Sequence, residues 1–185
     1  MELTAILMLG GVALSRHLYL PKIAYRENYL QIAAEVAGPG RPNCTAHHPD
    51  GSEEPCFPHF SIRTSGKVNA WSHGGHIQFS SAAMTVLPPD QFALLAGHEI
   101  AHYYLGHNGS TAANELEADM LGAVLACRAG YRIDAALGLF DHAHGNGGYP
   151  AKAQRRKVVM DMAMANGCML PDNPLPTLAQ ARWHN

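Results

Sequence analysis

Residues 98–102 read His98-Glu99-Ile100-Ala101-His102 and interrupt an otherwise apolar run, residues 92–105. In a helix, residues four apart lie on one face, so His98 and His102 can reach a single metal ion. Glu99 points to the adjoining sector, where its carboxylate can contact a water on that ion. Two imidazoles and a carboxylate are costly to bury in an apolar helix unless they have partners. We therefore expect a metal site here, with Glu99 as the general base.

The next predicted helix supplies the rest of the expected site. It contains Asn114-Glu115-Leu116-Glu117-Ala118-Asp119. A catalytic zinc ion needs a third protein ligand and one open position, and Glu115 is the candidate ligand. Asp119, four residues later on the same face, can accept a hydrogen bond from a ligand imidazole and fix its tautomer. Glu117 lies about 200° around the helix from Glu115, so we expect a solvated charge there.

A different zinc-protease pattern, HExxHxxGxxH, does not fit this sequence. It would require glycine at position 105 and histidine at position 108, where the chain has Leu105 and Asn108. His107 is one step out of register, so we expect a helix-terminal or surface histidine rather than a third ligand. Two imidazoles and one carboxylate suit zinc, and the expected cofactor is one Zn²⁺ per chain.

The composition indicates a single folded domain. Of the 185 residues, 47% are hydrophobic and 15% are charged, which excludes a disordered chain and provides enough apolar material for one core. The formal net charge of −2 gives no electrostatic attraction to nucleic acid, so we expect no such partner. We expect residues 21–170 to form the domain and the proline-rich residues 171–185 to form a surface tail.

The apolar segment formed by residues 1–20 fits two interpretations. Residues 3–14 are mostly apolar but fall short of the ~20 residues that a membrane-spanning helix needs. Their length suits a signal peptide or anchor, although Glu2 has the wrong charge for the start of such a segment. The alternative is a core helix that continues to Leu20. We expect any membrane association to involve this segment.

Four cysteines occur without a CxxC pair, which argues against a zinc ribbon or a thioredoxin-type motif. Cys44 and Cys56 flank a polar stretch that we expect to be a loop. They can form a local disulfide or remain two thiols, and three pairings of the four cysteines are open. On the N-terminus alone a cytoplasmic location is slightly favoured, whereas a bridge between Cys44 and Cys56 would make the bacterial periplasm plausible.

The remaining pattern predicts an α+β fold, rich in helices, with a small antiparallel sheet packed on the HExxH helix. Pro88-Pro89-Asp90 predicts the start of that helix, with Asp90 as its N-cap. Residues 145–148 read Gly-Asn-Gly-Gly and predict a flexible joint. The predicted strands are residues 60–63, 68–73 and 76–80, and the predicted helices are residues 22–37, 91–105, 112–129, 133–142 and 151–165.

Three motifs in this order resemble the HtpX-like and CaaX-prenyl-protease-like family of gluzincin metallopeptidases. They are Asn69-Ala70-Trp71 with Gly74-Gly75-His76-Ile77, the HExxH with Gly106-His107, and Glu115-Leu116-Glu117-Ala118-Asp119. The resemblance covers about residues 67–131, and the chain is similar to compact members without several membrane spans. It implies a zincin-like fold and a zinc endopeptidase that uses metal-activated water. The implied partner is an unfolded or flexible polypeptide, in protein quality control or processing.

Five further residues are candidates for substrate or transition-state contacts. Tyr149-Pro150 followed by Arg155 and Arg156 resembles the family's His-Pro and Arg after the glutamate helix. Tyr149 can polarise a peptide carbonyl, and either arginine can contact substrate or the glutamate helix. His73 and His76 flank the Gly-Gly turn and can line the cleft. We expect the edge of the sheet, either residues 68–73 or residues 76–80, to bind an extended substrate by strand addition.

Two alternative hypotheses also assume a bound metal ion, but neither assumes an enzyme that is active as folded. In a silent zinc-binding module acting through protein interaction, His107, His142 or His144 would close the site as a fourth ligand. In a latent enzyme, His142, His144 or the N-terminal segment would block the open position until displaced. The presence of Glu99 argues against a purely structural site, because such a site has no use for that carboxylate.

Overall fold

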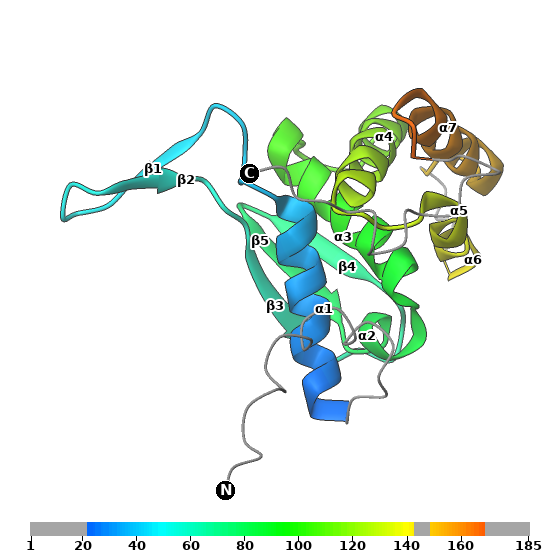
Figure 1. Ribbon diagram of the computed structural model, residues 1–185, viewed down its shortest axis with the longest axis horizontal. Coiled ribbons are helices and arrows are strands. Elements are labelled where there is room, and N and C mark those ends of the chain that lie inside the picture. Colours follow the sequence, from blue (N-terminus) through cyan, green and yellow to red (C-terminus); the bar gives the residue numbers. More distant parts are fainter. Residues whose placement is uncertain (1–21, 143–148, 169–185) are drawn as a thin grey trace, which may run out of the picture.

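The computed structural model describes residues 22–142 and 149–168, and Figure 1 shows how their elements are arranged. Both the apolar segment of residues 1–20 and the tail of residues 171–185 lie outside the described residues. Helices and a small sheet together confirm the α+β class. The helices are α1 Lys22–Ala37, α2 Ala83–Val86, α3 Pro89–Leu105, α4 Ala112–Arg128, α5 Ile133–Ala136, α6 Leu139–His142 and α7 Lys152–Ala165. The strands are β1 Thr45–His47, β2 Glu53–Pro55, β3 His59–Arg63, β4 Ala70–His73 and β5 His76–Ser80.

The main sheet has the strand order β3-β5-β4, and it is mixed rather than antiparallel as predicted. β4 and β5 form an antiparallel hairpin through Gly74 and Gly75, which adopt φ of 55° and 83° that glycine tolerates best. β3 runs parallel to β5. The prediction was wrong because it assumed that strands adjacent in sequence pair in order. In the structure β5 lies between β3 and β4, and β4 is an edge strand.

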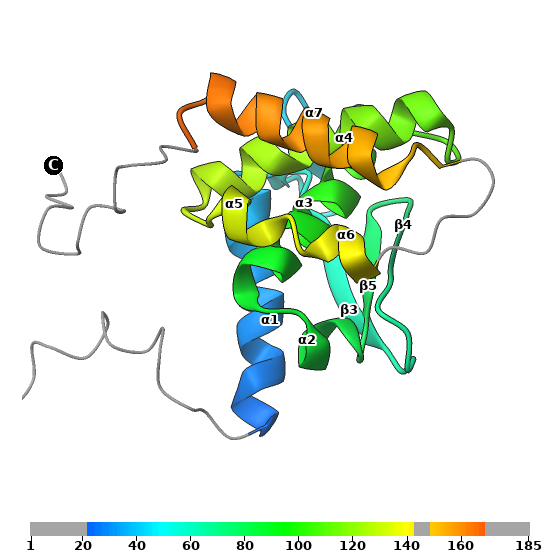
Figure 2. The ribbon, with the colours of Figure 1, turned by 90° about the vertical axis from the view of Figure 1, so that its right-hand side faces the viewer.

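One face of this sheet is covered by α1 and α3, as Figure 2 shows. Ile77 and Phe79 of β5 point into this core and are fully buried. The ring of Phe79 lies 4.8 Å from that of Phe92 in α3, which in turn lies 4.6 Å from Tyr29 in α1. Alternation along β5 puts His76 and Gln78 on the opposite, more exposed face. The core therefore fixes α3 directly on the sheet.

The start of α3 differs from the prediction at Asp90. The helix begins at Pro89, with Pro88 as N-cap, so Asp90 lies inside the first turn. Its carboxylate instead accepts a hydrogen bond of 2.9 Å from the backbone N–H of Arg132. This bond ties the start of α3 to the segment that leads into α5.

The predicted helix of residues 133–142 is broken into α5 and α6. The break lies at Leu137 and Gly138, and an added Cβ on Gly138 would lie 2.3 Å from Nε2 of the Gln91 side chain of α3. Packing against α3 therefore decides the path of this segment, and a regular helix of ten residues would not follow it.

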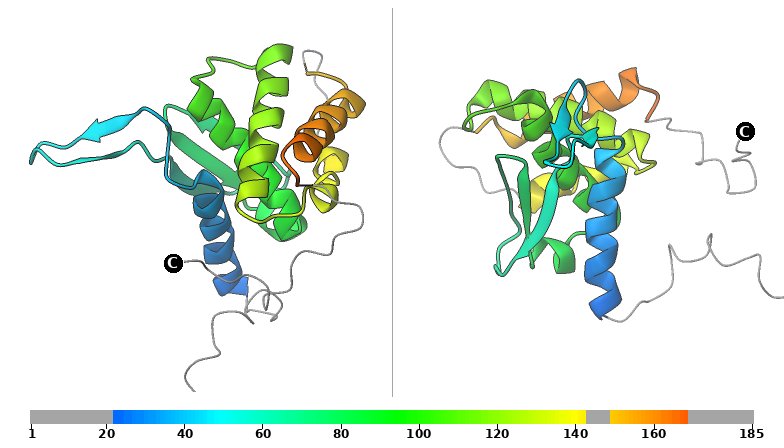
Figure 3. Two further views of the ribbon diagram at one scale, coloured as in Figure 1. Left: turned by 45° about the horizontal axis from the view of Figure 1, so that its top comes forward. Right: turned by 90° about the vertical axis from the view of Figure 1, so that its left-hand side faces the viewer.

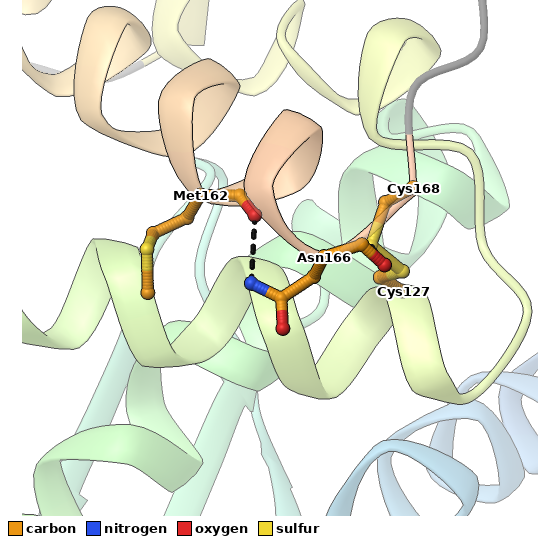
Figure 4. The surroundings of a disulfide bond; sticks show 4 residues. All are labelled: Cys127, Met162, Asn166 and Cys168. Carbon is orange, nitrogen blue, oxygen red and sulfur yellow. Dashed lines mark hydrogen bonds between the residues drawn. A yellow bond between two sulfur atoms is a disulfide. The ribbon is translucent and has the colours of Figure 1, made fainter.

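Two disulfides join parts of the chain, and both lie in the described residues. Cys44–Cys56 closes the base of the β1–β2 hairpin, which we had expected to be a loop and which projects from the body in Figures 1 and 3. Cys127–Cys168 joins the last turn of α4 to the residues after α7, as Figure 4 shows. In the described ranges, none of the helices has the length and apolar character needed to cross a bilayer.

Candidate metal centre

The site lies where α3 and α4 pack against each other. α3 brings His98, Glu99 and His102 to this contact, and His98 and Glu99 are 8% exposed. Thr111 caps α4 by accepting a hydrogen bond of 3.2 Å from Asn114 N–H, which places Glu115 in the first turn. Glu115 is 2% exposed. Polar side chains buried this deeply need partners, and here they supply one another.

Three of these side chains can hold one metal ion. The Nε2 atoms of His98 and His102 lie 3.1 Å apart, and the nearest Glu115 oxygens lie 3.3 Å and 3.6 Å from them. Around a tetrahedral zinc ion with ligands at about 2.0–2.1 Å, neighbouring ligand atoms are separated by about 3.3 Å. The three separations match this geometry, so the donor set fits a zinc ion by chemistry and by size. These three residues are the one such cluster in the described part of the chain.

Glu99 lies in the same cavity as the three candidate ligands. Burial raises the pKa of its carboxyl above the usual value, while the nearby His98 lowers it and Glu115 raises it. A carboxylate with a raised pKa is a better proton acceptor at neutral pH than a solvated one. Glu99 therefore combines a raised pKa with a place in the wall of the cavity that the candidate ligands share.

The Nδ1 atom of His98 contacts an ion pair that Asp119 of α4 forms with Arg155 of α7. This Nδ1 lies 2.9 Å from Asp119 Oδ1, and Arg155 donates two hydrogen bonds to the same carboxylate, at 2.6 Å and 2.7 Å. Burial raises the pKa of Asp119, but the bonds from Arg155 and His98 lower it below its ordinary value. Burial lowers the pKa of His98, and its bonds with Asp119 and Glu115 outweigh this and raise the pKa to about 9 in the absence of metal.

The Nδ1 atom of His102 contacts a different pair of side chains, which His107 forms with Glu117. This Nδ1 lies 2.9 Å from Nδ1 of His107, whose Nε2 lies 3.2 Å from Glu117 Oε2. Of the two expected positions for His107, helix-terminal or surface, the structure has the first, since His107 follows the end of α3 and its side chain is 8% exposed. Glu117 is 56% exposed, so it is solvated as predicted, but one oxygen bonds to the ring. Burial and the nearby charge of His98 lower the pKa of His102 to about 4.

A cavity of about 540 Å³ opens in front of these residues. One wall is β4 with the residues before it, including Lys67, Asn69 and Trp71, and another is formed by Leu139, Phe140 and His142 at α6. Tyr149 also lines the cavity and is 42% exposed. Of the residues named as possible fourth ligands, His107 and His142 line the cavity, and His144 lies outside the described residues.

Three of the candidate contact residues lie elsewhere. His73 and His76 are exposed at the Gly-Gly turn and are not among the residues that line this cavity, because the strand places Trp71 and Ser72 there instead. Arg156 points away and pairs with the exposed Asp141 at 2.5 Å. Residues 76–80 form the central strand β5, so they do not offer an edge. Of the two expected edges, only β4 is an outer strand of the sheet that the described residues form.

The chain matches no protein-family model, and no curated protein is similar to it at a significant level. Sequence reasoning expected Arg155 or Arg156 to contact substrate or the glutamate helix, but it did not single out the pairs Arg155–Asp119 and His107–His102. The Gly106-His107 pair carried a signal for the second contact, because a glycine that ends a helix can turn the next residue back onto the last turn.

Proposed function

We propose that this protein is a zinc-dependent endopeptidase with a zincin-like fold, related to the HtpX-like and CaaX-prenyl-protease-like gluzincins. One observation carries the proposal. The ligand atoms of His98, His102 and Glu115 lie at the separations expected around zinc, and Glu99 lines the same open cavity. Three protein ligands and an open side are typical of catalytic rather than structural zinc sites.

In this mechanism the chain's own residues orient the ion and move the proton. A zinc ion bound here would activate a water and polarise the peptide carbonyl. Glu99 accepts a proton from the attacking water and passes it to the leaving amine nitrogen. Asp119 holds His98 in the orientation in which Nε2 faces the other ligands, and Arg155 keeps the Asp119 carboxylate charged. Tyr149 lines the cavity and is 42% exposed, and its proposed role is to contact the carbonyl of the substrate.

The proposed substrate is an unfolded or flexible polypeptide. β4 is an edge strand and forms one wall of the cavity, so an extended segment that pairs with β4 would pass beside the candidate ligands. Most backbone N–H and C=O groups of a folded protein are already paired within its own structure, so an unfolded or flexible segment is the better partner for β4. A role in protein quality control or processing follows from this preference and from the family resemblance.

The two disulfides support a location outside the reducing cytoplasm, such as the bacterial periplasm. All four cysteines are paired, and disulfides persist where the environment is oxidising. This evidence outweighs the slight preference for the cytoplasm that we drew from the N-terminal residues.

The test compares cleavage of unfolded casein by the zinc-loaded wild type, by Glu99→Gln and by Glu54→Gln. Glu54 is an exposed carboxylate on the β1–β2 hairpin, so Glu54→Gln is a matched control. We expect the wild type and the control to cleave, and Glu99→Gln to lose about 10²–10⁴-fold in rate while it keeps its zinc. Tight zinc binding without cleavage by any of the three proteins would instead support a silent binding module.

A further inference from the structure

The two ring nitrogens of His102 face different partners. Nε2 faces the metal site, 3.1 Å from Nε2 of His98 and 3.6 Å from Oε1 of Glu115. Nδ1, on the other side of the ring, lies 2.9 Å from Nδ1 of His107. The second ring nitrogen of His107 lies 3.2 Å from Oε2 of Glu117. His102, His107 and Glu117 thus form a chain that leads from the metal site to the surface.

Metal binding selects one arrangement of hydrogens along this chain. Two Nδ1 atoms at hydrogen-bond distance must share one hydrogen, since one has to donate and the other has to accept. If Nε2 of His102 binds the metal, its Nδ1 carries the hydrogen and donates it to His107. His107 then carries its own hydrogen on Nε2 and donates it to the Glu117 carboxylate. Every donor and acceptor in the chain is satisfied in this arrangement.

The contact between His102 and His107 depends on how α3 ends. Gly106 adopts φ of 68°, and the backbone N–H groups of Gly106 and His107 donate to the carbonyls of Tyr103 and His102, respectively. This is a Schellman ending, which reverses the chain and turns the residue after the glycine back over the last turn. The side chain of His107 is consequently 8% exposed and lies against His102.

The second contact comes from α4, which presents three acidic residues to the site. Glu115 faces the ligand nitrogens and Asp119 bonds to His98, whereas Glu117 reaches His107 on the outer side. The two ligand histidines are therefore supported differently. The side chain of Asp119, which bonds to His98, is 3% exposed and paired with Arg155. The side chain of Glu117, which bonds to His107, is 56% exposed.

We propose that His107 and Glu117 are positioning residues that hold His102 in the tautomer and orientation in which Nε2 is free to bind the metal. The proposal rests on metal binding at this site but not on the proposed peptidase activity. It also assigns His107 a role other than fourth ligand, because its ring meets His102 at the nitrogen that faces away from Glu115 and His98.

The first test uses the wild-type protein and needs no substitution. Long-range ¹H–¹⁵N correlation spectra of the imidazoles identify which nitrogen carries hydrogen in each histidine. We expect hydrogen on Nδ1 of His102 and on Nε2 of His107, both in the metal-free protein and after zinc is added. Hydrogen on Nε2 of His102 in the metal-free protein, or on Nδ1 of His107 in the zinc-loaded protein, would overturn the proposal.

The second test measures zinc affinity by competition with a chelator. His107→Leu removes the acceptor for His102, and we expect affinity to fall by about 10–100-fold. His107→Asn can place an oxygen close to the position of Nδ1, so we expect it to recover most of that loss. Glu117→Gln keeps an acceptor for His107 but loses the charge, and we expect an intermediate affinity. His59→Leu, at an exposed histidine on β3, is the matched control and should bind like the wild type.

The two proposals fail in distinguishable ways. If His107→Leu binds zinc as tightly as the wild type, the positioning role is wrong even when casein is cleaved. If casein is not cleaved but zinc affinity follows the expected order, the peptidase is wrong and the positioning role stands. Thermal unfolding of each variant identifies any that does not fold, and the spectra of the wild type then decide the question.

Discussion

Gly97 of α3 and Gly122 of α4 bring the backbones of the two helices into direct contact beside the candidate metal site. A Cβ on Gly97 would lie 2.5 Å from the carbonyl oxygen of Gly122, and a Cβ on Gly122 would lie 2.6 Å from the backbone nitrogen of His98. No side chain larger than hydrogen fits at either position without a shift of the helices. This close approach lets carboxylates on α4 reach the imidazoles on α3.

Gly122→Ala should therefore separate the helices and disturb the site. We expect overpacking to lower the free energy of unfolding by about 1–3 kcal/mol, although alanine is the better helix former. Zinc affinity should fall as well, because Glu115 and Asp119 move with α4. Gly66→Ala is the matched control, since a Cβ there meets nothing within 4 Å. Urea unfolding and chelator competition check both effects, and wild-type zinc affinity in Gly122→Ala would contradict this role of the contact.

The neighbouring arginines of α7 give a second matched pair. Arg155→Met leaves the buried Asp119 without its strongest partner, and removing one member of a buried ion pair costs about 3–5 kcal/mol of stability. Arg156→Met removes a partner of the exposed Asp141, for which about 0–1 kcal/mol is expected. Denaturant unfolding of both variants measures the difference. Equal effects of the two substitutions would show that the Arg155–Asp119 pair does not support the site.

Sequence reasoning could predict those parts of the site that depend on local spacing. The four-residue spacings of His98 to His102 and of Glu115 to Asp119 determine which side chains share a helix face, whatever the rest of the fold does. The same reasoning predicted the four longer helices, α1, α3, α4 and α7, to within about two residues, an ordinary margin for helix ends.

Contacts between distant segments could not be predicted in this way. The pairing of Arg155 with Asp119 depends on how α7 lies on α4, and the sequence offered Arg156 as an equal candidate. The position of β5 between β3 and β4 is likewise a property of the whole sheet. In the sequence, Gly97 and Gly122 are two residues of low helix propensity within predicted helices. Only the structure shows that α3 and α4 approach closely at these glycines.

Zinc affinity should rise with pH. Without metal, the pKa of His98 is about 9, so at neutral pH the ring carries a proton that zinc must displace, while His102, with a pKa of about 4, is already neutral. Release of one proton predicts an affinity gain of about tenfold per pH unit between about pH 6 and pH 8. Calorimetry in buffers of different ionisation enthalpy counts the protons released. An affinity that is independent of pH would contradict a protonated His98.

The same pKa predicts the pH dependence of stability in the metal-free protein. The folded-state pKa of His98 lies above its unfolded value of 6.5, so the stabilisation is complete below pH 6.5 and is lost as pH rises toward about 9. Metal-free protein should thus become easier to unfold across this range. Zinc-loaded protein should not show this decrease, because the bound ion replaces the proton. Urea midpoints at several pH values, with and without zinc, test the difference.

The two disulfides should differ in their effect on the site. Cys127–Cys168 spans 41 residues and ties α7, which carries Arg155, to α4, whereas Cys44–Cys56 spans 12 residues at the base of a projecting hairpin. Replacing the first pair by serines should cost about 2–5 kcal/mol of stability and weaken zinc binding. Replacing the second pair should cost less and leave zinc affinity unchanged. Equal zinc affinity in both double variants would contradict the role of α7 in holding His98.

In the proposed site, His98, His102 and Glu115 would bind one zinc ion and leave a position open beside Glu99. X-ray absorption at the zinc edge, on protein with its zinc content measured, identifies the ligands of that ion. We predict one zinc per chain, with two imidazole nitrogens and the remaining ligands oxygen, at about 2.0–2.1 Å. We also predict that Glu115→Ala changes the spectrum and Glu54→Ala does not. A third imidazole, or a spectrum unchanged in Glu115→Ala, would contradict the account.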